Sequence, residues 1–514
     1  MKQLFCLLLI SLPGFSQTTS TALMTDRAAA RFLDQATWGP TPDSIAALEK
    51  MGIAGWLKTQ FSAKPSNLPD QAILDSAGKS NNDLGPVQAA FFQNTVNGPD
   101  QLRQRVAFIL SQIWVVSQVS VHPAYAFPPY WRIFRDHAFG NYRDIIKAVT
   151  LSPAMGTYLN MANNNKANTS KGTAANENYA REMMQLFTLG LTELNPNGSP
   201  LLDENKNPIP TYNQAVVTNM AKVLTGWTYP TAPGATAKTN NPAYYFGEMN
   251  AVESEHDTTA KAIFNNLTIP AGQTAEQDLE ALLNLLMQQP TMAPFVSEQL
   301  IEHMVTSNPS PAYIERVAQV FSSSDGDMEP VITAILTDPE ARAGDSGSAP
   351  VNATFGHLRE PILFLSNLAR GLNATMDGSN TLNNYANELG QDLFNAPSVF
   401  SYFSPQYRIE GGLLGPEFQI YSTQTASDRA DVVNSALYGS LGKTTTLDLS
   451  PFVAKAGTVS SLVDYIGYVF LHSGMSSSLA LAAADAANAQ STAAAKAQAA
   501  LYVVLTSNEY QVVR

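Results

Sequence analysis

One short segment of this 514-residue chain gathers polar side chains at the start of an expected helix. It runs from Asn176 to Gly190, follows an asparagine-rich loop, and opens with the polar residues Asn176, Glu177, Asn178, Arg181 and Glu182. Glu177 and Arg181 are four residues apart, in the acid-first order that favours an ion pair along a helix. One interpretation is an amphipathic helix with a surface ion pair. The other is a polar cluster that binds a ligand or ion at the helix start.

A second polar segment places an imidazole beside a carboxylate. His256 and Asp257 follow Glu253 and Glu255, at the end of a long loop rich in Pro, Thr, Gly and Asn. A functional interpretation is that the pair binds a divalent cation or serves as a general base. The structural interpretation is that it forms a solvated acidic turn. If this loop folds over the first segment, Glu182 joins His256 and Asp257. We therefore treat these three residues as candidate catalytic groups and a divalent cation, of unknown identity, as the candidate cofactor.

Motifs of several well-known enzyme classes are missing from the sequence. No two of the six histidines have the spacing of a zinc-binding helix, and there is no nucleophile elbow, phosphate loop or dinucleotide fingerprint. Glu302 and His303 lie on an amphipathic stretch, where a surface or packing role is expected. Aromatic residues in 230–250 and 402–407 either stack on sugar rings or pack their loops down.

Charge argues against nucleic acid as a partner. The formal net charge is −13, only 14% of the residues are charged, and Lys and Arg form no cluster. Binding to nucleic acid requires a basic face that neutralises phosphates. We therefore expect no nucleic-acid partner.

The elements that must position these side chains are mostly helices. Apolar residues recur at helical spacing in the stretch that follows Pro99, and Thr274 with Gln277 matches a capping box. Alternating strand patterns are scarce, and two long polar loops span 195–211 and 230–250. We predict a mainly α fold, a large body of stacked helix pairs with long polar loops and few or no strands. Further helical stretches are expected near 291–305, 311–322, 354–371, 427–439, 458–472 and 479–505.

The N-terminus has the pattern of a secretory signal. Lys2 precedes an apolar core from Leu4 to Leu12, and small residues follow up to Ser16. We expect a signal peptide at 1–16, a short linker at 17–25 and a single helical domain at 26–514. The protein would then be exported, to the periplasm, the cell surface or the medium. The apolar core is too short to span a bilayer, and no transmembrane helix is expected in the mature chain.

Several ordered segments resemble one bacterial family, the domain of unknown function 1800. The similarity covers nearly the whole mature chain, and its ordered agreement is more specific than any single match. The matching segments are Arg31-Phe32-Leu33, Ala36-Thr37-Trp38-Gly39-Pro40, Gly140-Asn141-Tyr142-Arg143-Asp144, Ser152-Pro153-Ala154-Met155, Asn176 to Gly190, Leu224-Thr225-Gly226-Trp227, His256-Asp257 with Lys261, and Leu389-Gly390-Gln391.

The resemblance implies an exported protein, with no established chemistry. It adds Lys261 to the candidate binding residues Asn176, Glu177, Asn178 and Arg181. The family usually has a second Glu where this chain has Gln185, and a Gly-Trp where this chain has Phe400-Ser401-Tyr402.

Two functions remain open at this level. One is a divalent-ion-dependent hydrolase that acts on an extracellular polymer. The other is a non-catalytic secreted binding or assembly protein. Neighbouring genes in the family imply that its partner would be another exported protein of sulfatase-like type.

Overall fold

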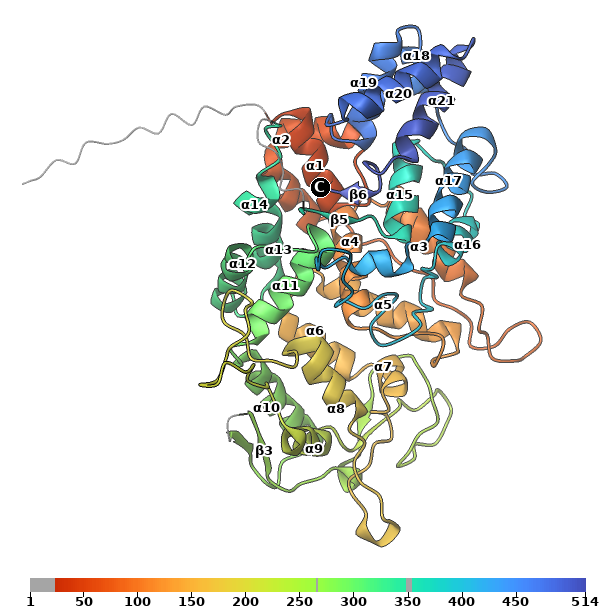
Figure 1. Cartoon of the computed structure of the whole chain (residues 1–514). Coiled ribbons are helices and arrows are strands. Elements are labelled where there is room, and N and C mark those ends of the chain that lie inside the picture. Colours follow the sequence, from red (N-terminus) through yellow and green to blue (C-terminus); the bar gives the residue numbers. More distant parts are fainter. Residues whose placement is uncertain (1–23, 265–266, 348–353) are drawn as a thin grey trace, which may run out of the picture.

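The structure is a computed structural model that describes residues 24–264, 267–347 and 354–514. Within these ranges helices dominate, and the expectation of a mainly α protein is confirmed. The molecule is elongated, with residues 450–505 at one end and residues 160–180 at the other (Figure 1). The predicted signal peptide at 1–16 lies outside the described residues.

The centre of the molecule is built around one fully packed helix, α4. Its predicted apolar stripe, which includes Leu102, Val106 and Ile109, is buried, and the helix packs against α1, α2, α3, α5 and α11. The helices of this part are α1 (Asp26–Ala36), α2 (Pro42–Phe61), α3 (Gly85–Asn97), α4 (Gln101–Ile113), α5 (Phe127–His137), α6 (Tyr142–Thr150) and α7 (Pro153–Tyr158).

The middle of the chain supplies helices that pack on their sequence neighbours, α11 on α12 and α12 on α13. The predicted capping box is present, because the Thr274 side chain accepts from the Gln277 amide and Gln277 caps Thr274 in return. The helices are α8 (Asn178–Glu182), α9 (Gln214–Val223), α10 (Ala275–Met287), α11 (Met292–Met304), α12 (Pro311–Ser323), α13 (Met328–Thr337) and α14 (Pro339–Arg342).

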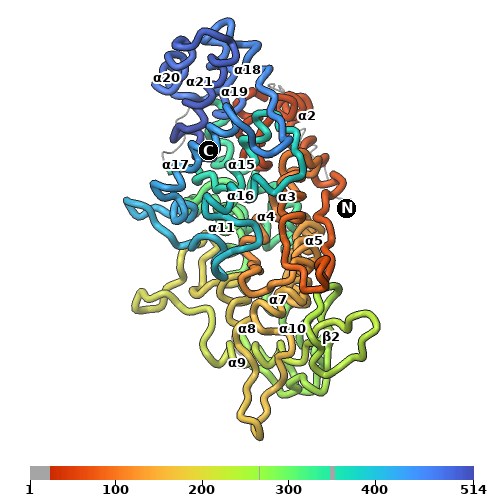
Figure 2. The backbone as a smooth tube through the Cα atoms, turned by 90° about the vertical axis from the view of Figure 1, so that its right-hand side faces the viewer, coloured from red at the N-terminus to blue at the C-terminus, as the bar shows by residue number. Residues whose placement is uncertain are grey.

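The last third of the chain returns to the first. Helices α15 and α16 pack against α3, although about 270 residues of chain separate them (Figure 2). The alanine-rich stretch 479–505, expected as one helix, forms two packed helices because Thr492 caps a new one. The helices are α15 (Pro361–Gly371), α16 (Thr381–Glu388), α17 (Thr423–Tyr438), α18 (Ser450–Lys455), α19 (Val459–Phe470), α20 (Ser477–Asn488) and α21 (Ala493–Leu505).

Strands are short and form three antiparallel pairs among the described residues. Trp227 pairs with Ala251, Lys261 with Ile269, and His357 with Val513. The strands are β1 (Trp227–Thr228), β2 (Asn250–Ala251), β3 (Lys261–Ile263), β4 (Leu267–Ile269), β5 (His357–Leu358) and β6 (Val512–Val513).

The long polar loops are present, and one of them is held down by its aromatic residues. Tyr245 and Phe246 lie 5.4 and 5.3 Å from the ring of Tyr125, so these side chains pack the 230–250 loop onto the body. In the part of the chain that the structure describes, none of the helices combines the length and apolar character that crossing a bilayer requires.

Candidate functional site

The segment singled out by its sequence begins as a helix and then widens. Helix α8 ends at Glu182, and Met183–Thr188 form a π-helical turn, η3, in which the Leu189 amide donates to the Met184 carbonyl at 2.9 Å. The segment stops at Gly190, as predicted, with φ of +74°. A Cβ there would lie 2.7 Å from the Phe295 ring, so the tight packing also requires glycine. Such π turns occur often at functional sites.

Glu177 and Arg181 form the ion pair expected from their spacing, at 3.1 Å. Glu177 also accepts hydrogen bonds from Gln214, at 2.9 and 3.0 Å, and from Thr218 at 2.9 Å. Donation by Gln214 is the main reason that the pKa of Glu177 lies below its ordinary value. This carboxylate joins α8 to α9.

Glu182 lies half-buried further along the same helix. Its Oε2 atom is buried without a hydrogen-bond partner, and burial raises the pKa of this carboxyl. The pKa of Tyr158 is raised to about 12, chiefly by burial and to a smaller extent by the nearby negative charge of Glu182.

His256 and Lys261 are fully buried and share one carboxylate, that of Asp278 in α10. The Nε2 atom of His256 lies 2.9 Å from Asp278 Oδ2, and Lys261 donates to the same oxygen. The other ring nitrogen of His256 lies 2.9 Å from the Thr225 carbonyl. The predicted neighbour, Asp257, is half-buried and accepts from Thr259 instead. The imidazole is thus enclosed, with both nitrogens engaged.

The two predicted segments do approach each other, but through other residues. Asn176 and Glu255 line one polar groove with a volume of about 620 Å³, which we call the asparagine groove. Neither Glu182 nor His256 lines it. The groove is lined by Asn160, Ala162, Asn163, Asn164, Asn165, Lys166, Ala167, Asn168, Lys171, Thr173, Ala174, Asn176, Ser254 and Glu255. Within 24–264, 267–347 and 354–514, no group of three or more His, Cys, Asp or Glu side chains is arranged to hold a metal ion.

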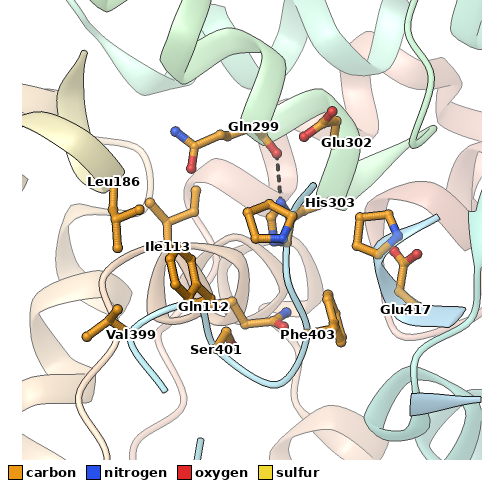
Figure 3. Close-up of a pocket in the computed structure, with 13 residues that line it drawn as sticks. Gln112, Ile113, Leu186, Gln299, Glu302, His303, Val399, Ser401, Phe403 and Glu417 are labelled. Carbon is orange, nitrogen blue, oxygen red and sulfur yellow. Dashed lines mark hydrogen bonds between the residues drawn. The ribbon is translucent and has the colours of Figure 1, made fainter. Parts of the chain in front are cut away.

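A second cavity lies at the centre of the molecule, where distant segments meet. Helix α11 contributes Glu302 and His303, α4 contributes Gln112, and the η3 turn contributes Leu186 (Figure 3). We call it the central pocket, and its volume is about 60 Å³. It is lined by Gln112, Ile113, Leu186, Gln299, Glu302, His303, Val399, Phe400, Ser401, Phe403, Pro405, Pro416 and Glu417.

Two adjacent residues of α11 in this pocket, Glu302 and His303, have pKa values shifted in opposite directions. Burial, followed by the nearby carboxylates of Glu298 and Glu417, raises the pKa of Glu302 well above its ordinary value. Burial lowers the pKa of His303. Both shifts favour the uncharged form, which for Glu302 is a carboxyl that can donate a proton and for His303 an imidazole that can accept one.

The ring of His303 is oriented by its own helix. Its Nδ1 atom lies 2.9 Å from the Gln299 carbonyl, which can only accept, so Nδ1 carries the proton (Figure 3). The Nε2 atom is then left with its lone pair. The His303 carbonyl itself accepts from the buried Arg105 at 2.8 Å, which ties this turn of α11 to α4.

Three polar atoms of the pocket lining are buried without a hydrogen-bond partner: Gln112 Oε1, Gln299 Nε2 and Glu417 Oε2. Gln112 and Glu417 are each 6% exposed. Most buried polar atoms in proteins are paired, so unpaired ones gathered in one cavity indicate a place where a ligand or water completes the bonding. His357, which does not line the pocket, has its Nδ1 atom 3.3 Å from the other oxygen of Glu417.

Residues 31–512 match the family described as "Protein of unknown function (DUF1800)". The chain belongs to this DUF1800 family. No curated protein and no solved structure matches it. The matched range includes every residue of both the asparagine groove and the central pocket, so both lie within the DUF1800 region.

The central pocket of this DUF1800 protein was not foreseen from its residues. The amphipathic spacing around Glu302 and His303 predicts a surface or packing pair, because spacing alone does not show what covers a helix. One signal was available: Glu298 and Glu302 are like charges four residues apart, an arrangement that destabilises a helix without compensation. Phe400 and Ser401 also line the pocket.

Proposed function

We propose that this protein is an exported hydrolase that cleaves small acyl esters from an extracellular polymer, with the central pocket as its active site. The observation that carries the proposal is the pairing of Glu302 and His303. Adjacent residues of one helix offer a protonated carboxyl and a neutral imidazole to the same cavity. Groups with pKa values pushed apart in this way are suited to act as acid and base at neutral pH.

The proposed reaction is addition of water to an ester carbonyl. His303 Nε2 removes a proton from water as the water oxygen bonds to the carbonyl carbon. The tetrahedral intermediate then breaks its bond to the polymer oxygen, which takes the Glu302 proton. The products are a free acid and a polymer hydroxyl, and transfer of the proton from His303 to Glu302 restores both groups. The unpaired amide nitrogen of Gln299 is a donor for the developing oxyanion.

The size of the pocket limits the acyl group. A water molecule needs about 10–15 Å³ measured in the same way. The central pocket, at about 60 Å³, therefore accommodates a group of roughly four heavy atoms, such as acetyl. Phe400 is 43% exposed and lines the pocket, so its ring offers a face on which a sugar of the polymer stacks.

Hydrolysis of p-nitrophenyl acetate and of acetylated xylan tests this proposal. We expect acetate release, with p-nitrophenyl octanoate cleaved far more slowly because its chain exceeds the pocket. His303→Gln and Glu302→Gln should each lower kcat about 100-fold or more, the usual contribution of a positioned acid or base. Far-UV circular dichroism checks that both variants fold.

The matched control is His122→Gln, because His122 is exposed and lies outside the pocket lining. It should retain full activity. Unchanged kcat in folded His303→Gln protein, or equal rates on the acetyl and octanoyl esters, would refute the assignment.

A non-catalytic binding protein is the second candidate function. It is favoured by the asparagine groove, which is large and polar but lies apart from the residues of the central pocket.

A further inference from the structure

The segments that line the asparagine groove are held together by hydrogen bonds to their backbone. Asn164, 7% exposed, accepts from the Asn176 amide at 2.7 Å and donates to the Asn176 carbonyl at 3.2 Å. The carbonyl of Asn164 accepts from Gly226 at 2.9 Å, and Lys166 donates its amide to the Glu255 carbonyl at 2.8 Å. These bonds join the two segments that form the walls of the groove.

Further asparagines fix the base of the loop. The Asn163 side chain accepts from Thr228 at 2.6 Å and donates to the Asn241 carbonyl at 3.1 Å. Asn160 and Asn163 both adopt positive φ, of 59° and 60°, a conformation that asparagine tolerates better than most residues. One set of asparagines therefore serves the architecture of the loop.

A second set of polar groups is not used by the architecture. The Asn165 side chain and the ammonium groups of Lys166 and Lys171 make no hydrogen bond or ion pair with any described residue, although all three line the groove. The side-chain amide nitrogens of Asn168 and Asn176 are likewise unengaged. Glu255 is the one carboxylate in the lining.

We propose that the asparagine groove binds an acidic oligosaccharide, a short stretch of sugars that carry carboxylates. Side-chain amides both donate and accept, as sugar hydroxyls require, and the two lysines supply cationic partners for carboxylate groups. The groove volume of about 620 Å³ lies within the usual range for ligand sites.

Two features select this ligand class over its rivals. No aromatic residue lines the groove, so stacking, the usual contact to a neutral sugar, is replaced by charge. Two lysines in a chain of net charge −13 are too few to neutralise the phosphates of a nucleic acid. Binding here does not depend on the acid–base chemistry of the central pocket.

Calorimetric titration of the purified protein with octagalacturonate tests the proposal. We expect saturable binding that weakens as salt rises, because the contacts are exposed ion pairs. Neutral maltooctaose should bind at least about tenfold more weakly, a difference of about 1.4 kcal/mol. The double variant Lys166→Gln/Lys171→Gln should lose a similar factor, and Asn165→Ala should weaken binding without changing its salt dependence.

Two controls make the outcome decisive. Lys64→Gln/Lys79→Gln removes two exposed lysines elsewhere on the surface, alters net charge equally and should leave affinity unchanged. His303→Gln should bind as the unmodified protein does, so failure of the proposed catalysis and failure of this site are distinguishable. Equal affinity for the neutral octasaccharide, unchanged affinity in the Lys166/Lys171 variant, or no binding at millimolar ligand would overturn the proposal.

Discussion

At the scale of single residues, Asp278 shows how a buried carboxylate is stabilised by its partners. Its side chain is fully buried, and one of its oxygens contacts both His256 and Lys261, which are themselves 0% exposed. An isolated charge in such a place would be strongly unfavourable, whereas a paired and hydrogen-bonded one is tolerated. Glu253 binds the first amide of the same helix, Ala275, so the turn before His256 is anchored as well.

We predict that Asp278→Ala lowers the free energy of unfolding by about 3–5 kcal/mol, the usual effect of removing one partner of a buried pair. Both His256 and Lys261 would be left without their carboxylate. Urea denaturation followed by circular dichroism measures the loss. Glu276→Ala, an exposed acid in the same helix, is the control and should cost less than about 1 kcal/mol. A comparable loss in the two variants would contradict the role assigned to Asp278.

His256 and His303 illustrate what residue type alone does not reveal. His256 stands beside acidic residues in the sequence, which made it the better candidate, yet its ring is enclosed by Thr225 and Asp278. His303 stands in an unremarkable amphipathic pattern, yet it lines a cavity. The difference arises from contacts between segments far apart in the chain, and a single sequence does not encode these in its local spacing.

At the scale of elements, the helices were predictable where local signals agree. The apolar stripe of α4 and the capping box of α10 are local patterns, and both are present. The widening of the 176–190 segment was not predictable. In the η3 turn, Phe187 stacks on Trp114 with ring centroids 4.3 Å apart, and Thr188 donates to the Met183 carbonyl. Such a turn is stabilised by tertiary packing rather than by its own residues.

Helix α11 carries two neighbouring carboxyl groups, Glu298 and Glu302, which should make the free energy of unfolding depend on pH. Burial raises the pKa of Glu298 to about 7, and Glu302 lies one turn further along the same helix. Below pH 4.5 the Glu298 carboxyl is protonated in both the folded and the unfolded chain. As pH rises from 4.5 to 7, the unfolded chain loses the proton first, so ionisation increasingly favours unfolding.

We therefore predict that the free energy of unfolding falls between pH 5 and pH 8, by on the order of 1–3 kcal/mol from Glu298. Glu298→Gln should remove that part of the fall and raise stability at pH 8. Urea midpoints at the two pH values provide the measurement. The control is Glu315→Gln, an exposed residue of the adjacent helix α12, which should leave the pH dependence as it is. A protein equally stable at both pH values would contradict the prediction.

At the scale of the whole molecule, one segment connects the two candidate sites. The stretch 176–190 lines the asparagine groove with Asn176 and the central pocket with Leu186. The other side chains that line the central pocket come from elements outside this stretch. Helix α8 and the η3 turn that follows it therefore connect the proposed binding site to the proposed catalytic site along the chain from Asn176 to Leu186.

The last prediction concerns export of the whole chain. The apolar core at Leu4–Leu12 and the small residues up to Ser16 are typical of a cleaved signal, and we propose that the protein is exported. N-terminal sequencing of protein from the periplasm or culture fluid should find a start near Gln17. Because Cys6 is the only cysteine, the mature chain should also lack any thiol, and titration with a thiol reagent after denaturation should give no signal.

Lys2→Glu should reduce export, since signal peptides require a positive start. Exported protein that begins at Met1, or that retains one thiol per chain, would contradict cleavage and place Cys6 in the mature protein.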